Sequence, residues 1–161
     1  MTMYLGPSFS QGNVSLCAVI EAEIAAIDAA SDVTDARAFW LAEAKSRDDV
    51  IYFGVRTDGE LVGQFFLHDI DEQQGEALLG YHLFEPRFRA RGIGSTALKL
   101  LQRYVAEKTT LRCVFAITNI ANTPSRRIVA RCGFVEVGAS REDPELSVVM
   151  EWQVPLRTRL A

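Results

Sequence analysis

The middle of the chain constrains its fold most, because three strand-like runs follow one another there with only short turns between them. Residues 50–56, 60–70 and 76–84 are rich in β-branched and aromatic side chains, which favour strands. A Thr-Asp-Gly sequence at 57–59 separates the first two runs and is typical of a hairpin turn. Consecutive strands with short connections usually pair with each other, so we expect three antiparallel strands.

Further helical and strand-like segments flank this unit. A helix is predicted from Ile93 to the residue before Thr109, and the near-continuous apolar run at 111–118 predicts a strand buried on both faces. The other expected elements are strands at 14–20, 134–139 and 145–154 and helices at 21–30, 34–47 and 122–132, the last capped by Asn122 or Thr123. No linker or repeat divides the chain. We therefore expect one α+β domain over residues 1–161, with a mixed, mainly antiparallel sheet of about seven strands and about four helices.

The charge balance limits the partners that the protein can have. A net charge of −4 argues against a general role on nucleic acid or on anionic membranes, because both depend on an excess of Lys and Arg. No apolar run reaches the length of about 18 residues that crosses a membrane, and the N-terminus lacks the charged region of a signal peptide. We expect a soluble, cytoplasmic protein with no nucleic-acid or membrane partner.

The cysteines are expected to be buried thiols. Cys17, Cys113 and Cys132 are odd in number and have no C-x-x-C spacing. The only histidines, His68 and His82, do not form a ligand pair near them. We therefore expect neither a metal site nor a disulfide framework.

A basic turn at residues 89–94 precedes the helix that begins near Ile93. The first backbone N–H groups of a helix have no partners within it and carry partial positive charge, which makes a helix start an anion site. Gly92 and Gly94 have no Cβ atoms to keep a phosphate away, and Arg89 and Arg91 add cationic donors. The pattern predicts a pyrophosphate site; the alternative is a helix start with a solvated basic face.

Residues 89–94, Arg-Ala-Arg-Gly-Ile-Gly, resemble the Arg/Gln-x-x-Gly-x-Gly/Ala motif of the GNAT superfamily of acyl-CoA-dependent N-acyltransferases. Asn122 and Ser125, followed by Gly133 and Phe134, resemble a second motif of that family, Asn-x-x-Ser/Ala and then Gly-Phe. The element order agrees with the family from about residue 14 to residue 154, and the chain is similar to the branch that includes N-terminal acetyltransferases of ribosomal proteins. The resemblance implies a GNAT-type fold and acetyl-CoA as the acyl donor.

The resemblance also implies which residues contact acetyl-CoA. The backbone of Leu83 and Phe84 would pair with the pantetheine arm, and Asn122 would lie near it. The pyrophosphate would be held by the N–H groups of Arg89, Ala90, Arg91, Gly92, Ile93, Gly94 and Ser95. A strand edge that ends at Glu85-Pro86 would offer unused backbone groups to the amides of the arm.

The catalytic groups depart from the family pattern at one position. Many members carry a tyrosine four residues before the glycine of Gly-Phe to protonate the departing thiolate, and this chain has Val129 there. Ser125 or water could supply the proton instead; a third alternative is a protein that binds acyl-CoA with little chemistry. For the base, Glu76 and His82 share a strand face because their separation is even. Tyr81, of opposite parity, is expected to pack.

The expected function is N-acetyl transfer from acetyl-CoA to a primary amine, either a small molecule or a protein N-terminus. Direct transfer needs no enzyme nucleophile, so no cysteine has to be catalytic. The alternative is a catalytically weak acyl-CoA-binding or partner-binding module with the same fold. A homodimer is a further expectation, and the acceptor amine stays open.

Overall fold

The computed structural model describes residues 8–18, 47–84, 86–89 and 91–155. The helices expected at 21–30 and 34–47 lie outside the described residues, apart from residue 47 itself, as does Ala90. Within the described residues, no helix is long and apolar enough to cross a membrane.

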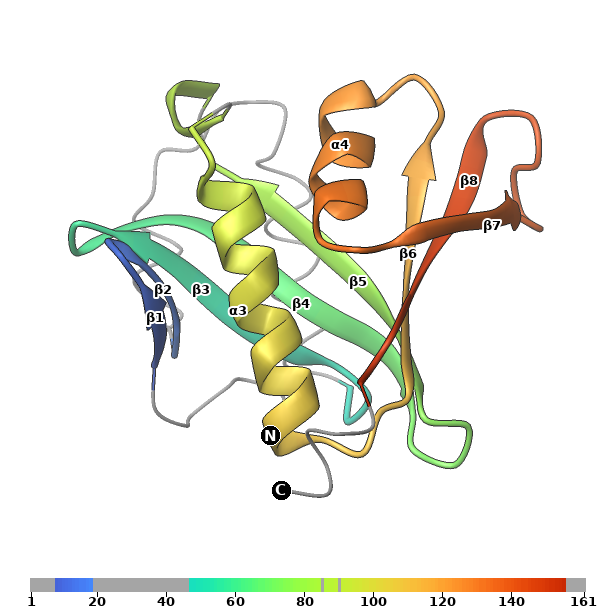
Figure 1. Cartoon of the computed structure of the whole chain (residues 1–161), viewed down its shortest axis with the longest axis horizontal. Helices are drawn as coiled ribbons and strands as arrows, with labels where there is room; N and C mark the ends of the chain where they lie inside the picture. Colours follow the sequence, from blue (N-terminus) through green and yellow to red (C-terminus); the bar gives the residue numbers. More distant parts are fainter. Residues whose placement is uncertain (1–7, 19–46, 85, 90, 156–161) are drawn as a thin grey trace.

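The described residues form an α+β structure around one mixed sheet of eight strands, as Figure 1 shows. The spatial order is β1-β2-β3-β4-β5-β6-β8-β7, and every neighbouring pair is antiparallel except β5 and β6. The strands are β1 (Phe9–Gln11), β2 (Val14–Cys17), β3 (Ile51–Thr57), β4 (Glu60–Asp71), β5 (Glu76–Leu83), β6 (Cys113–Asn119), β7 (Val135–Ala139) and β8 (Ser147–Gln153). The expected mainly antiparallel mixed sheet is confirmed, and the count of about seven is corrected to eight by β1, a three-residue strand too short to give a periodic signal.

The turn between β3 and β4 has the geometry that its sequence predicts. Thr57 pairs with Glu60, so the loop contains only Asp58 and Gly59. Their φ angles are 51° and 81°, the left-handed values that a type I′ hairpin turn requires at both positions. This turn sets the register of β3 against β4.

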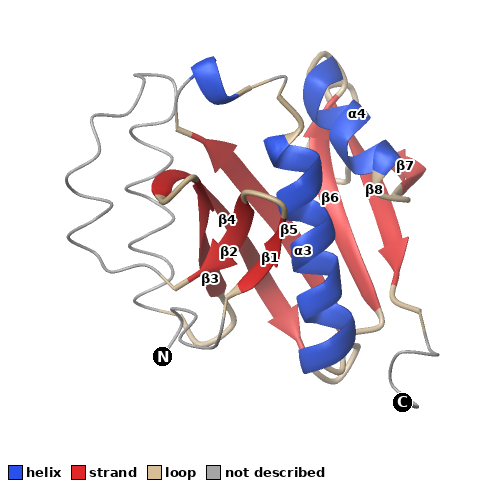
Figure 2. Ribbon diagram, turned by 60° about the vertical axis from the view of Figure 1, so that its left-hand side comes forward, coloured by secondary structure: helices blue, strands red, loops and turns tan. Residues whose placement is uncertain are grey.

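Two helices and a short 3₁₀ turn accompany the sheet in the described residues: η1 (Pro86–Phe88), α3 (Ile93–Lys108) and α4 (Thr123–Arg131). Helix α3 lies across one face of the sheet (Figure 2) and buries an apolar stripe that includes Leu98, Leu101 and Val105. The Tyr104 ring of α3 meets the Phe53 ring of β3 edge-on at 4.9 Å. Each such buried apolar side chain stabilises the fold by about 1.5–3 kcal/mol.

The strand register assigns side chains to the two faces of the sheet. Phe53 pairs with Phe65, and Phe65 pairs with Tyr81, so these three rings lie on the α3 face. The alternate residues of β4 and β5 therefore lie on the opposite face. These are Gln64, Phe66 and His68, with their partners His82, Gly80 and Leu78.

Strands β5 and β6 pair over only part of their length. Their parallel ladder joins Glu76 to Cys113, Ala77 to Val114 and Leu78 to Phe115, and then it ends. Beyond the ladder the strands diverge toward the end of the sheet where α4 lies (Figure 1). This gap positions the candidate site.

Candidate active site

A pocket of about 340 Å³ occupies the gap between β5 and β6. It is bounded by residues 78–82 of β5, residues 116–119 of β6, Phe66 and His68 of β4, the cap residue Asn122 and Ser125 of α4. Because it lies where the ladder is interrupted, its lining comes from both faces of the sheet. A molecule in this gap can be approached by different groups from each side.

Gly80 is required at the wall of this pocket. A Cβ atom there would lie 2.1 Å from Cε2 of Phe66, a ring that is only 1% exposed. The Phe66 ring stacks on Tyr52 at 6.3 Å and lies 6.5 Å from the His82 ring. The missing side chain therefore leaves room for an aromatic ring that helps to shape the pocket.

Ser125 lies in the first turn of α4 and faces β5. Asn122 caps this helix by accepting a hydrogen bond from the backbone N–H of Ser125 at 3.2 Å, as a cap residue does. The Ser125 Oγ lies 2.6 Å from the hydroxyl of Tyr81. Tyr81 also stacks on Phe65 at 4.8 Å, so the expected packing is confirmed, but sequence reasoning missed the hydroxyl pair. Burial raises the pKa of Tyr81, which keeps its phenol protonated and able to donate.

His82 is held from behind by two buried polar side chains. The hydroxyl of Tyr52 donates to Oε1 of Gln64, and Nε2 of Gln64 lies 3.2 Å from Nδ1 of His82. Gln64 is fully buried, so its amide needs both partners. These two hydrogen bonds connect β3 through β4 to β5 and fix the orientation of the His82 ring.

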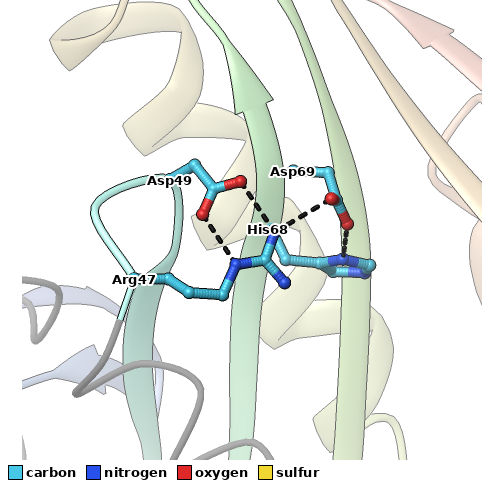
Figure 3. A network of polar contacts seen from close by, with 4 residues as sticks. All are labelled: Arg47, Asp49, His68 and Asp69. Carbon is cyan, nitrogen blue, oxygen red and sulfur yellow. Dashed lines mark hydrogen bonds and ion pairs between the residues drawn. The ribbon is translucent and has the colours of Figure 1, made fainter.

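His68, the second histidine of the pocket, is held by a carboxylate (Figure 3). Its Nδ1 lies 2.6 Å from Oδ2 of Asp69, and Arg47 binds Asp69 at 2.9 Å and Asp49 at 2.7 and 2.8 Å. Burial raises the pKa of Asp69, but hydrogen bonds from His68 and Arg47 outweigh it and hold that pKa below its usual value. The side-chain hydrogen bond from Arg47 likewise lowers the pKa of Asp49.

The sequence contained no signal for this arrangement. Asp69 lies at an irregularity of β4 between His68 and Asp71 and has a φ of 49°, a left-handed value that is uncommon for a residue other than glycine. A regular strand would direct successive side chains to opposite faces. The irregularity lets neighbouring residues, His68 and Asp69, meet.

Glu76 is not brought to this pocket. It begins β5 and pairs with Asp71 and Cys113. His82 is six positions further along the strand, a distance of roughly 20 Å. Glu76 and His82 share a face as expected, but they cannot act on one amine.

The basic turn adjoins the other end of β5. Leu83 ends that strand, and Nη2 of Arg89 lies 3.5 Å from the Leu83 carbonyl oxygen. Helix α3 begins at Ile93 after Gly92, whose φ is 78°, and no side chain in the described part of the chain caps it. Its first N–H groups therefore keep the anion-binding character that the sequence predicts.

A second cavity, of about 310 Å³, adjoins the start of α3. Arg91, Gly92, Ile93 and Thr96 line it together with the turn between β1 and β2. Gly94 instead faces α4, because a Cβ there would lie 3.1 Å from the end of the Ile128 side chain. Ser95, in the same first turn of α3, accepts from the Cys132 thiol through its carbonyl oxygen at 3.6 Å.

The three cysteines are buried and unbridged, as expected, and none of them lines the pocket. In the described residues, no group of three His, Cys, Asp or Glu side chains is arranged to hold a metal ion. The Cys113 thiol donates to Glu151 Oε1 at 3.0 Å. Burial and this carboxylate raise the pKa of Cys113 to about 12.

We predict that Cys113 resists thiol reagents in the folded protein at mildly alkaline pH, because the reactive thiolate is scarcely populated there. Labelling followed by mass spectrometry checks this, and labelling after guanidinium unfolding is the control. Rapid modification of Cys113 in the folded protein would contradict the prediction.

Residues 19–135 match the family described as the acetyltransferase (GNAT) domain. Because this match covers more than half of the chain, the protein belongs to the GNAT acetyltransferase family.

Individual relatives agree with this assignment. YdaF of Bacillus subtilis (strain 168), provisionally named a ribosomal N-acetyltransferase, is 33% identical over 89 residues, which are 55% of this chain and 48% of that relative. The chain thus spans about half the length of this curated relative. The solved structure of RimL, a ribosomal-protein acetyltransferase in complex with coenzyme A, superposes with a TM-score of 0.75 at 17% identity, covering 92% of this chain and 98% of that one. RimJ of Mycobacterium smegmatis, with bound CoA-disulfide, gives 0.71 at 20% identity, covering 87% and 81%. These two structures share the fold with this protein.

Proposed function

We propose that the protein transfers an acetyl group from acetyl-CoA directly to a primary amine. The observation that carries this proposal is the interrupted ladder between β5 and β6, because the pocket in that gap joins groups from both faces of the sheet. The uncapped start of α3 follows β5 in the chain and suits a diphosphate. A thioester in the gap and a diphosphate at the helix start are the two parts of acetyl-CoA that such a site would hold.

The proposed contacts to acetyl-CoA follow from this arrangement. Past Leu78 the ladder does not use the β6-facing backbone of β5, so its groups as far as Leu83 can pair with pantetheine amides. The N–H of Phe84 donates to the Val62 carbonyl oxygen of β4 at 2.9 Å, so Phe84 would pair with the arm only through other atoms. The N–H groups of residues 89–95 would bind the pyrophosphate. Asn122, which lines the pocket, would lie beside the pantetheine arm.

The proposed chemistry uses the two sides of the gap. The amine nitrogen forms a bond to the thioester carbon, the carbon–sulfur bond breaks, and the departing thiolate takes a proton. Ser125 is the proposed donor of that proton, from the side on which Tyr81 contacts it. His82 contributes its ring to the other side of the pocket. Val129, at the family's usual tyrosine position, is fully buried and has no acidic proton to donate.

The proposed acceptor is a small-molecule amine or a protein N-terminus, and the names of RimL and YdaF favour the second. The protein is expected to act in the cytoplasm, as a homodimer. A binding module that holds acetyl-CoA without transferring the acetyl group is the alternative, favoured by valine in place of tyrosine at position 129.

The experiment that tests the proposal is calorimetric titration with acetyl-CoA, followed by an acetylation assay on a panel of amines and N-terminal peptides. We expect micromolar affinity and transfer to at least one acceptor; 3′-dephospho-CoA is the comparison ligand. Absence of binding at millimolar acetyl-CoA would overturn the assignment of the site. Binding without transfer to any acceptor would identify the binding module.

Arg89→Glu is expected to raise the KM for acetyl-CoA about tenfold or more, because it replaces a cationic donor beside the proposed pyrophosphate with a negative charge. Steady-state kinetics check this. Arg141→Glu, a charge reversal in the exposed loop before β8, is the matched control and should leave KM unchanged. An unchanged KM for Arg89→Glu would contradict the role of the basic turn.

A further inference from the structure

The two histidines of the pocket have chemically opposite partners at Nδ1. Both lie on the sheet face opposite α3, and both line the gap between β5 and β6. Nδ1 of His68 meets the carboxylate of Asp69, whereas Nδ1 of His82 meets the amide nitrogen of Gln64. Because a neutral imidazole carries one proton on one of its two nitrogens, these partners select different tautomers.

The partners of Gln64 determine the tautomer of His82. The Gln64 oxygen accepts from the Tyr52 hydroxyl, so its amide nitrogen is the atom directed at His82. That nitrogen can only donate, and Nδ1 of His82 must accept. The proton of the neutral ring is therefore on Nε2. His82 can donate a hydrogen bond from Nε2, but its basic lone pair is already occupied at Nδ1.

The carboxylate of Asp69 determines the opposite tautomer for His68. A carboxylate can only accept, so Nδ1 of His68 carries the proton and the lone pair is on Nε2. Arg47 fixes Asp69 in turn, and it is itself held by both oxygens of Asp49. A carboxylate behind an imidazole orients the ring and stabilises the imidazolium that forms when the ring takes a proton.

We infer that His68 is the catalytic base, which accepts the proton of the attacking amine on Nε2, and that His82 is a hydrogen-bond donor in the same pocket. This inference rests on the proposed acetyl transfer. As the nitrogen–carbon bond forms, the amine proton moves to His68; as the carbon–sulfur bond breaks, the thiolate takes a proton from Ser125. His68 then releases its proton to solvent and Ser125 regains one, so the protons balance over one turnover.

Asp69 is the charged neighbour of the His68 ring in the part of the chain that the structure describes, and Arg47 and Asp49, which precede β3, are linked to the ring through Asp69. His82 of β5 lines the same pocket further along the strand, and Tyr81 lies on the opposite face of the sheet. Arg47 forms ion pairs with both Asp49 and Asp69.

Paired glutamine substitutions of the two histidines test the inference. His68→Gln should lower kcat/KM for the amine about 100-fold and remove the acid limb that belongs to the base from the pH profile. His82→Gln should lower the rate but keep that limb. The acceptor amine also titrates and contributes a limb of its own to the pH profile. The same acceptor is therefore used for the parent, His68→Gln and His82→Gln, so that this limb is common to all three. Acetyl-CoA titration shows whether each variant retains the folded site.

Asp69→Asn and a spectroscopic measurement distinguish a catalytic role of His68 from a merely structural one. The asparagine amide can donate a hydrogen bond to Nδ1 of His68, so the proton is no longer confined to Nδ1. We expect kcat/KM to fall about tenfold while the affinity for acetyl-CoA stays unchanged. Nitrogen-15 NMR of the neutral rings should show Nδ1–H for His68 and Nε2–H for His82 in the parent protein. In Asp69→Asn, the His68 signal should shift toward the other tautomer.

The outcomes separate this inference from the proposed function. Full transfer activity in His68→Gln, or loss of the limb only in His82→Gln, would overturn the role of His68 while leaving acetyl transfer intact. Identical tautomers for the two rings would overturn the reasoning from their partners. A parent protein that acetylates no amine would instead overturn the proposed function, and the catalytic role of His68 with it.

Discussion

Ser125→Ala is expected to lower kcat for acetyl transfer about 100-fold while the KM for acetyl-CoA changes little, because a general acid acts on the transition state rather than on binding. The Ser125 hydroxyl lines the gap between β5 and β6 and lies 2.6 Å from the Tyr81 hydroxyl. If the Tyr81 hydroxyl donates a hydrogen bond to Oγ of Ser125, the Ser125 proton is left to point toward the departing sulfur. Steady-state kinetics on one acceptor amine check the prediction, and equal turnover of variant and parent would reject this role.

Tyr81→Phe provides the matched control for Ser125→Ala. It removes one hydroxyl and keeps the ring that stacks on Phe65. If Tyr81 acts through Ser125, Tyr81→Phe should lower kcat in the parent protein and have little further effect when Ser125→Ala is already present. A double-mutant cycle measures this coupling. Additive effects would show that the two hydroxyls act independently.

Gly80→Ala is expected to destabilise the protein by about 3 kcal/mol, the upper part of the usual range for overpacking. The new methyl group would lie 2.1 Å from Cε2 and 2.3 Å from Cζ of Phe66, and that buried ring has Tyr52, His68 and His82 around it. The ring cannot move without disturbing the wall of the pocket. Urea denaturation gives the free energy of unfolding, and a variant as stable as the parent would contradict the prediction.

Gly94→Ala is the control for Gly80→Ala, since it adds the same methyl group in a different setting. Its nearest neighbour is the flexible end of Ile128 at 3.1 Å, and alanine is favoured over glycine within a helix by about 1 kcal/mol. We expect equal or greater stability.

Local signals in the sequence predicted most of the sheet and the α3 and α4 helices. The turn at Asp58 and Gly59, the start of α3 at Ile93 and the Asn122 cap each depend on a few adjacent residues, and each is confirmed. The three cysteines are buried as expected. Strand β1 was missed because three residues are too few to show a period.

The groups on the two sides of the pocket could not be predicted in the same way. Tyr81 and Ser125 are 44 residues apart, and Gln64 and His82 are 18 apart, so only the register of the sheet and the docking of α4 bring them together. Strand parity did predict that Glu76 and His82 share a face. Parity carries no information on distance along a strand, and for that reason Glu76 was grouped with a residue at the far end of β5.

The sequence by itself determined the family, the order of the described elements from β2 onward and the start of α3 at Ile93, because each depends on motifs or on backbone chemistry within a few residues. Only the tertiary structure decided which side chains meet in the gap between β5 and β6. The pairing of His68 with Asp69 depends on one irregularity in β4, and the tautomer of His82 depends on a hydroxyl that arrives from β3. Their hydrogen-bond partners, rather than their residue type, distinguish the two histidines.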